Sequence, residues 1–367
     1  LMYEHRDILL GIKWNVVVFD EAHQLKNIVA QRTGVARQLK SRFKLAMTGT
    51  PLENNLIEFY SLFDLILPRG LGSLGEFRKL YVEDYSLFRA AQMEHLRLRS
   101  KPVLMRRTKQ SVHLELPAKI ETLVPLEMEK KQKDLYRRIA MQFNSEVLAV
   151  IDRNGEASAQ LHMLSALMRL RQICSHPGVL ESVNYSAVPP KLEYLLTMLP
   201  DIIDSGESVL IFTQFRKTMD LILPQLKKIG PTYNLHGGMS SDERRKTLNE
   251  FSGSDKASIL LMTLKTGGVG LNLTKATYVF HLEPWWNPAA EDQATDRAHR
   301  LGQTKAVNVY RLLMQDSLEE RIQEMKARKQ KMYSALLDED YSENMEIKGS
   351  QGLTKDDFSY LIGNLKD

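Results

Sequence analysis

Two carboxylates at the end of a short apolar run are the residues best suited to chemistry in this sequence. Residues 16–19, Val-Val-Val-Phe, predict a strand buried on both faces, and Asp20-Glu21-Ala22-His23 follows directly. Acids at the carboxyl end of a parallel strand lie where α/β proteins bind ligands. In a nucleotide hydrolase, such an aspartate holds magnesium and the glutamate orients or deprotonates the attacking water. The alternative is a strand that ends in two solvated acids.

A second polar turn follows a second predicted strand, at 43–47. Thr48-Gly49-Thr50 offers two hydroxyls, and a helix is expected from about 56 to 67. Those hydroxyls could hydrogen-bond the carboxylates, or couple a nucleotide site to a second site. The alternative is an ordinary turn before a helix.

Glycines and arginines in the second half of the chain suit phosphate chemistry. Gly267, Gly268 and Gly270 follow a predicted strand at 259–262, where glycine lets backbone N–H groups approach a phosphate closely. A flexible loop is the alternative for this run.

Gln293, Arg297 and Arg300 are spaced by four and three residues, so on the helix predicted at about 289–300 they share one face. Arginines aimed at a phosphate stabilise the charge that develops during transfer. The alternative is a solvated, charged helix face.

The elements that would position these residues alternate between strand and helix, which is typical of parallel α/β sheets. The second half predicts strands at 209–212, 233–235, 259–262, 278–282 and 307–313 with helices between them. Residues 74–113 and 128–174 read as helical, and 181–190 is the best linker candidate. A charged helix is expected from 318 to about 337.

The composition is that of an ordinary folded chain. The 367 residues suggest roughly two domains, and 43% hydrophobic with 26% charged residues argues against disorder. No run of about 18 apolar residues predicts a membrane span, and no signal peptide is expected. The single cysteine excludes an internal disulfide and fits a reducing cytosol. The net charge of +5 permits a polyanionic partner without requiring one.

Taken together and in this order, the motifs resemble the Swi/Snf-type family of superfamily 2 helicase-like ATPases. The matching stretches are DEAH (20–23), TGTPLENN (48–55), VLIFTQF (209–215), TLKTGGVGLNL (263–273) and DQATDRAHRLGQ (292–303), with LMRRTKQSVHLELPAK (104–119), LRQICSHP (170–177) and EPWWNP (283–288) between them. The resemblance spans nearly the whole chain.

The resemblance implies a motor of two RecA-like lobes, with ATP between the lobes and double-stranded DNA across both. It implies Asp20 as the Mg²⁺ ligand, Glu21 as the residue that activates water, Arg297 and Arg300 as arginine fingers, and Gln293 near the γ-phosphate. His23, Thr48, Gly268 and Gly270 are the further residues expected at the nucleotide. The residues expected to grip DNA are Thr213, Gln214, Lys265, Thr266 and Gly267.

The same resemblance divides the chain into four parts. Residues 1–126 are expected to form a partial first lobe with a helical insertion at about 74–113, and 127–190 a helical protrusion and linker. Residues 191–314 are expected to form a complete second lobe, and 315–367 a C-terminal helical brace.

One family element is missing from the printed sequence. No G-x-x-x-x-G-K-[ST] stretch, the loop that cradles the β- and γ-phosphates, occurs in these residues. We expect this loop before residue 1, in a longer protein of which this chain is the carboxyl-terminal piece, and we expect the chain alone to be inactive. The alternative is a non-hydrolysing DNA-binding or regulatory module of the same fold.

Other features leave two interpretations open. Trp285 and Trp286 either pack in a core or stack on a sugar, with packing favoured. The basic cluster at 97–109 is a DNA-facing edge or a solvated helix face. Cys174 and His176 have the spacing of a metal pair, but structural packing is favoured because two further ligands are missing.

We expect a cytoplasmic, monomeric protein of bacterial or archaeal type, or a nuclear one if it is eukaryotic. It would work with proteins of transcription, repair or defence.

Overall fold

The computed structural model describes residues 2–49, 56–82, 89–107, 116–181, 183–267, 271–337 and 355–362. The chain divides into two compact units, residues 1–112 with 327–351 and residues 113–326 with 352–367. Each unit is described by itself.

The first unit holds two parallel strands, as predicted. Strand β1 (Trp14–Phe19) pairs with β2 (Ser41–Ala46) in the register Val16↔Phe43 and Val18↔Leu45. Helix α1 (Arg6–Gly11) precedes β1, and a short 3-10 turn and helix α2 (Gln31–Gln38) connect the two strands. A helical connection is what a parallel pair requires, because the chain must return to the starting edge.

Strand β1 is not buried on both faces, contrary to the prediction. Phe19 and the half-buried Val17 pack with residues of α2 and of α3 (Leu56–Ile66). Val16 and Val18, which point to the opposite face, are 53% and 50% exposed. The apolar run predicted the strand correctly. The burial fails because, among the described residues, helices cover only one face.

Helices α3 (Leu56–Ile66), α4 (Leu74–Tyr81) and α5 (Arg89–Ser100) complete the first unit. Helix α4 begins at a capping box, in which Ser73 and Glu76 each satisfy a backbone N–H of the other. The fully buried Phe77 packs against Tyr60 of α3 and Tyr81 of its own helix. The helical prediction for 74–113 therefore holds for α4 and α5. It is wrong for residues 104–107, which follow a short 3-10 turn at Lys101–Val103 and are not helical, and residues 83–88 and 108–113 lie outside the described part.

A six-stranded parallel sheet forms the centre of the second unit, in the order β3-β8-β7-β4-β6-β5. The strands are β3 (Lys119–Leu126), β4 (Ser208–Thr213), β5 (Thr232–Leu235), β6 (Ile259–Thr263), β7 (Ala276–His281) and β8 (Val307–Met314). All five strands predicted after residue 191 are present. Burial of β4 along its whole length explains why its sequence is a continuous apolar run.

Strand β3 differs from the expected division of the chain. We placed residues up to 126 in the first lobe, but β3 pairs with β8 from Lys119↔Val307 to Leu126↔Met314. Hydrogen bonding along its whole length assigns it to the edge of the second sheet. An edge strand reads the same in sequence whichever sheet it joins, so the pattern could not decide the partner.

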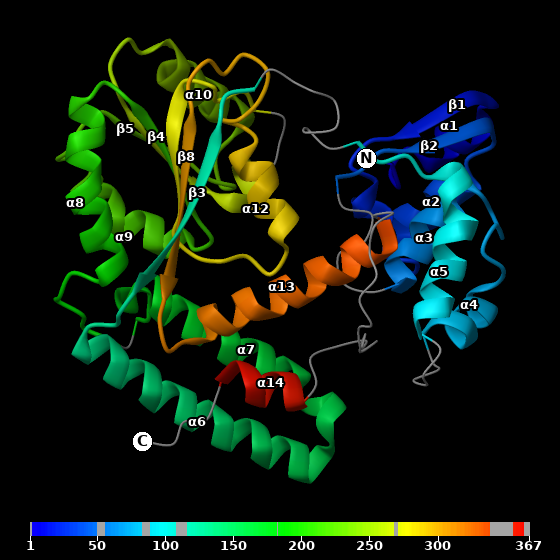
Figure 1. Cartoon of the computed structure of the whole chain (residues 1–367), viewed down its shortest axis with the longest axis horizontal. Coiled ribbons are helices and arrows are strands. Elements are labelled where there is room, and N and C mark those ends of the chain that lie inside the picture. Colours follow the sequence, from blue (N-terminus) through cyan, green and yellow to red (C-terminus); the bar gives the residue numbers. More distant parts are fainter. Residues whose placement is uncertain are drawn as a thin grey trace. The chain divides into compact units, whose positions relative to one another are not determined.

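Helices cover both faces of this sheet (Figure 1). Helices α8 (Pro190–Asp204) and α9 (Arg216–Leu226) pack on one face. Helices α10 (Ser241–Gly253) and α12 (Pro288–Thr295) contribute to the core on the other face, which also contains Phe212 and Val279. Ser240 and Glu243 form a capping box at the start of α10.

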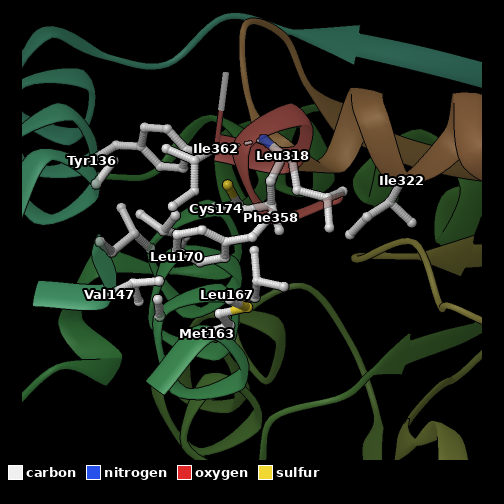
Figure 2. Close-up of a cluster of buried hydrophobic side chains, with 14 of the residues drawn as sticks. Tyr136, Val147, Met163, Leu167, Leu170, Cys174, Leu318, Ile322, Phe358 and Ile362 are labelled. Carbon is white, nitrogen blue, oxygen red and sulfur yellow. Dashed lines mark hydrogen bonds between the residues drawn. The ribbon is translucent and has the colours of Figure 1, made fainter. Parts of the chain in front are cut away.

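The remaining helices form a separate apolar cluster (Figure 2). Helices α6 (Lys130–Asn154) and α7 (Glu156–Ser175) are joined at Gly155, whose φ of 80° turns the chain back. Helices α13 (Leu318–Leu337) and α14 (Lys355–Ile362) pack against this hairpin. The Leu318 N–H donates to the Tyr136 hydroxyl at 2.9 Å, so the start of α13 is hydrogen-bonded to α6. We call this set of four helices the helical cluster.

Within the part of the chain that the structure describes, we find no helix with the length and hydrophobicity that a bilayer crossing requires.

His281 at the end of β7 makes the second unit sensitive to acid. Burial lowers its pKa to about 4, while the unfolded chain has the ordinary value of about 6.5. Between these values the unfolded state binds the extra proton, so stability falls as pH falls. We expect this histidine alone to cost about 3 kcal/mol across the window. Chemical denaturation of wild type and His281→Gln at a series of pH values measures it. Equal pH slopes in the two proteins would contradict the assignment.

Candidate functional site

The first set of predicted site residues lies where β1 and β2 end. The Met47 N–H donates to the Phe19 carbonyl at 2.8 Å, and the Ala22 N–H donates to the Met47 carbonyl at 2.9 Å. These two bonds extend the pairing of the strands past their ends. The turn at 20–23 and the turn at 47–49 are therefore held side by side, as parallel strands predict.

Glu21 adopts a left-handed backbone conformation, with φ 48° and ψ 46°. Its N–H donates to Asp20 Oδ1 at 2.9 Å. A residue other than glycine in this region costs of order 1–3 kcal/mol and is found preferentially at functional sites. The strain turns the chain sharply after β1, and the Asp20 carboxylate remains exposed.

His23 links the two turns through its ring. Its Nδ1 lies 3.3 Å from Glu21 Oε2 and 3.5 Å from Thr48 Oγ1. The sequence left two roles open for the threonine hydroxyls, a hydrogen bond to the carboxylates or a coupling between two sites. The structure places the Thr48 hydroxyl beside the His23 ring, which also lies near Glu21. Thr50 lies outside the described residues.

The arginines of the second set do not lie on the helix that was predicted for them. Helix α12 ends at Thr295, and Arg297 and Arg300 follow it in a turn segment, residues 296–303, which we call the finger loop. The Arg297 carbonyl accepts from the Leu273 N–H at 3.0 Å. Its partner is therefore a residue outside the helix, not the N–H four residues further along. The prediction that both arginines share a helix face with Gln293 is therefore wrong. All three side chains are nevertheless half-buried in the same unit.

Gln303 holds the finger loop in place. Its side-chain nitrogen lies 3.0, 3.1 and 3.1 Å from the carbonyls of Thr274, Ala276 and Ala298. Its side-chain oxygen accepts from the N–H groups of Thr304 and Lys305, both at 3.0 Å. One amide therefore satisfies five backbone groups. Gln303 has no role that the sequence predicts, because an amide in a polar motif is indistinguishable from a solvated one.

The finger loop is also hydrogen-bonded to the segment that follows the glycines. Arg300 Nη1 donates to the Leu271 carbonyl at 3.2 Å, in addition to the bond between Leu273 and Arg297. His299 Nε2 lies 2.8 Å from the Pro117 carbonyl, just before β3. The finger loop is therefore hydrogen-bonded both to residues 271–273 and to the segment before β3. Gly268 and Gly270 lie outside the described residues.

Two of the hydroxyls expected to grip DNA are buried and paired within the protein. Thr213 is 1% exposed, and its hydroxyl donates to Glu283 Oε1 at 2.9 Å. Thr266 is 5% exposed, and its hydroxyl pairs with that of Thr263 at 2.7 Å. These side chains hold their loops rather than face a ligand. Lys265 and Gly267 lie in the short helix α11 (Leu264–Gly267) after β6.

Glu283 organises the loops at the carboxyl edge of the sheet. It is 4% exposed and accepts from the hydroxyls of Thr213 and Ser175 and, at 2.8 Å, from the Gln214 N–H. Residues 213–215, the Gln214 loop, and residues 283–287, the tryptophan loop, are joined through this carboxylate. Sequence reasoning missed Glu283, and its only signal was an acid placed directly after a buried strand.

A second buried acid fixes helix α12 against α13. Glu291 is 2% exposed and lies 2.8 Å from Lys326 Nζ. It also accepts the Trp285 N–H and lies 3.4 Å from Arg311 Nε of β8. Burial lowers the pKa of Lys326 and raises the pKa of the neighbouring Asp292. This cluster of charges holds the helix that carries Gln293.

The structure shows the surroundings of the tryptophans, of Cys174 and of two arginines in the basic cluster. Trp285 packs with the α10-side core and Trp286 with the helical cluster, which confirms the packing interpretation. Cys174 is buried and free, and no group of three metal-ligating side chains is found in the described ranges. In the basic cluster, Arg97 is bonded to Glu94 of its own helix and Arg99 to the Gly70 carbonyl.

Asp20 fits the role of a single carboxylate ligand for Mg²⁺. Its side chain is exposed, and one of its oxygens is oriented by the Glu21 N–H. Magnesium at phosphate-transfer sites is usually bound by one or two carboxylates together with substrate phosphates and water.

Comparisons with known proteins agree with this geometry. The model of the SNF2-related domain matches residues 1–179, and that of the helicase conserved C-terminal domain matches residues 190–302. A solved SWI2/SNF2 ATPase core of Sulfolobus solfataricus, in complex with double-stranded DNA, is 30% identical with a TM-score of 0.50. That match covers 90% of this chain and 71% of the other. The chain belongs to the Swi/Snf family of helicase-like ATPases.

Curated Swi/Snf-type relatives are longer than this chain. It is 36% identical over 334 residues to an uncharacterized ATP-dependent helicase of Mycoplasma pneumoniae, covering 89% of this chain and 31% of the relative. It is 34% identical over 349 residues to the putative ATP-dependent helicase/translocase YwqA of Bacillus subtilis, covering 92% and 37%. The chain thus spans about a third of the length of these relatives. The predicted RecA-like α/β class is confirmed.

A substitution of Gln303 in this Swi/Snf chain tests whether its amide holds the finger loop in place. In Gln303→Glu, a carboxylate oxygen replaces the nitrogen that faces three carbonyls, so those bonds are lost and repulsion takes their place. We expect a loss of about 3 kcal/mol in unfolding free energy of the second unit and faster amide exchange in the finger loop. Denaturation and hydrogen exchange measure the two effects. Gln160→Glu, exposed on α7, is the control, and equal losses in both variants would refute the role.

Proposed function

We propose that this chain supplies most of the motor of an ATP-dependent translocase that moves along double-stranded DNA. The bonds from the finger loop to the segment after β6 carry the proposal. They join the arginines expected at the nucleotide to Leu271 and Leu273, through Leu273 with Arg297 and Leu271 with Arg300. Leu271 and Leu273 belong to the same predicted motif as Lys265, Thr266 and Gly267, the residues expected at the DNA. The proposed coupling between ATP and DNA runs along this linkage. The name of the Bacillus relative and the DNA in the Sulfolobus complex support the same assignment.

In the proposed mechanism, two sets of residues act on one ATP. Asp20 would hold Mg²⁺, which neutralises phosphate charge when bound. Glu21 accepts a proton from the attacking water, and His23 holds Glu21 and Thr48 in fixed positions. Arg297 and Arg300 stabilise the charge on the transferred phosphoryl group, and Gln293 orients the water or the γ-phosphate.

Three residues that were predicted to contact DNA have a positioning role in the proposed function. Thr213, Gln214 and Thr266 position the loops through internal bonds. Lys265 and the backbone N–H groups at and after Gly267 would then contact phosphates. Contacts of this kind hold a duplex without reading its sequence and make binding weaken steeply with salt.

The test is ATP hydrolysis with and without duplex DNA, in the printed chain and in a protein that carries it together with a phosphate-binding loop. We expect little or no turnover from the chain as printed, and turnover stimulated by duplex DNA in the longer protein. Tight magnesium-dependent ATP binding by the printed chain would contradict the first expectation. Duplex binding without hydrolysis in both would instead support the alternative of a non-hydrolysing DNA-binding or regulatory module.

Arg300→Ala in the longer protein tests the finger assignment. We expect turnover to fall by roughly 10³, by analogy with other arginine fingers, with duplex binding unchanged. Lys305→Ala is the control, because Lys305 forms only an exposed ion pair with Glu207 and such pairs are worth little. Normal turnover in Arg300→Ala would show that this arginine is not a finger.

A further inference from the structure

Arg171 lies almost fully buried where helix α7 meets the carboxyl edge of the sheet. It is 7% exposed. Its guanidinium carbon lies 6.0, 5.9 and 5.6 Å from the ring centroids of Phe215, Trp285 and Trp286. A charge in such a place is costly unless the protein provides hydrogen bonds and favourable ring faces for it. The burial of this charged side chain therefore indicates a role in the structure or function of the protein.

The hydrogen bonds of Arg171 join two loops. Its Nη2 donates to Gln214 Oε1 in the Gln214 loop and to the Pro284 carbonyl in the tryptophan loop, the latter at 2.9 Å. Gln214 Nε2 also donates to the Pro284 carbonyl at 2.9 Å. The three groups form a closed triangle, so neither loop can shift without breaking a bond to a charged donor.

The same face of α7 makes a second connection one turn further on. Ser175, four residues after Arg171, donates to Glu283 and pairs with the Thr218 hydroxyl of α9 at 2.7 Å. Glu283 in turn accepts from Thr213 and from the Gln214 N–H. Helix α7 thus holds both loops at two points.

The two tryptophans next to Arg171 pack in opposite directions. Trp285 joins the core that includes Phe212 and α10, and Trp286 joins the helical cluster. The guanidinium lies within reach of both rings, at the junction of the sheet with the helical hairpin. Its position can therefore transmit a displacement of the hairpin to the loops.

We propose that Arg171 is a positioning residue that fixes the Gln214 loop against the tryptophan loop and so supports the adjacent segment after β6, where Lys265 is proposed to contact duplex DNA and where Thr263 pairs with Thr213. The DNA part of this inference rests on the proposed function. Both loops follow neighbouring strands, β4 and β7, at one edge of the parallel sheet, where Phe212 pairs with His281. Lysine cannot substitute, because a compact ammonium lacks the planar face that lies among the rings.

Duplex affinity is the first measurement, by anisotropy of a labelled duplex with the full chain. We expect Arg171→Lys to weaken binding about tenfold, the effect of losing one charge-assisted hydrogen bond. Arg169→Lys is the matched control, because Arg169 lies on the same helix but is exposed. Equal affinities of wild type and Arg171→Lys would overturn the inference.

Tryptophan fluorescence is the second measurement and needs no DNA. In a Trp14→Phe background, only Trp285 and Trp286 emit, since the chain has three tryptophans. We expect Arg171→Lys to increase acrylamide quenching and to shift the emission, while Arg169→Lys leaves both unchanged. Quenching that is unaltered by the Arg171 change, in a protein with native circular dichroism, would show that the guanidinium does not hold the loops.

A double-mutant cycle separates positioning from general stability. If Arg171 acts through Gln214, the duplex affinities of Arg171→Lys and Gln214→Ala will not add in the double variant. Additive losses would assign Arg171 to the core alone and overturn the inference. Should Arg171→Lys fail to fold, Gln214→Ala cuts the same link from the loop side and must then weaken duplex binding by itself.

Failure of the proposed function is distinguishable from failure of this inference. If wild type does not bind duplex DNA, the proposed function and the DNA part of the inference fall together, and the fluorescence result still decides whether Arg171 holds the loops. If wild type binds and Arg171→Lys binds equally well, the proposed function stands and the inference fails.

Discussion

The finger loop belongs to no helix or strand, so its hydrogen bonds to other segments decide where Arg297 and Arg300 lie. Gln303 directs its amide to five backbone groups, and Leu273 takes the Arg297 carbonyl. An arginine that stabilises a transferred phosphate must be positioned to within a fraction of an ångström. A long side chain on a free loop would not meet that demand. The network around Gln303 fixes the backbone of the loop that carries both arginines.

The second unit is assembled around buried acids, each at a joint between elements. Glu283 joins α7 to the two edge loops, Glu291 joins α12 to α13, and Glu319 joins α8 to α13 through Lys191 at 2.7 Å. Glu319 is 0% exposed, and burial raises its pKa. Buried ion pairs contribute little net stability relative to apolar packing, but removing one partner is costly. Their effect is therefore to specify how the helical cluster packs on the sheet.

Predictions from the sequence succeeded where a short-range pattern has one structural meaning. The apolar runs at 209–212 and 259–262 became central strands, and the turn at Gly155 divides the predicted helical region 128–174. They failed where the outcome depends on distant partners. Residues 119–126 joined the second sheet, Val16 and Val18 remained exposed, and the helix before Arg297 ended early because Leu273 and Gln303 took up its carbonyl groups.

The sequence by itself determined the family, the α/β class and the residue types of the site, because glycines, acids and arginines at motif spacing carry chemistry that does not depend on the rest of the chain. Only the tertiary structure decided what each side chain does. Thr213 and Thr266 are motif residues, yet burial turns their hydroxyls inward. Arg171 and Gln303 lie in motif stretches without an assigned role, yet each joins backbone segments far apart in the chain. The physical reason is that a polar side chain has a role only through the partners that folding brings to it, and those partners lie up to 113 residues away for Arg171.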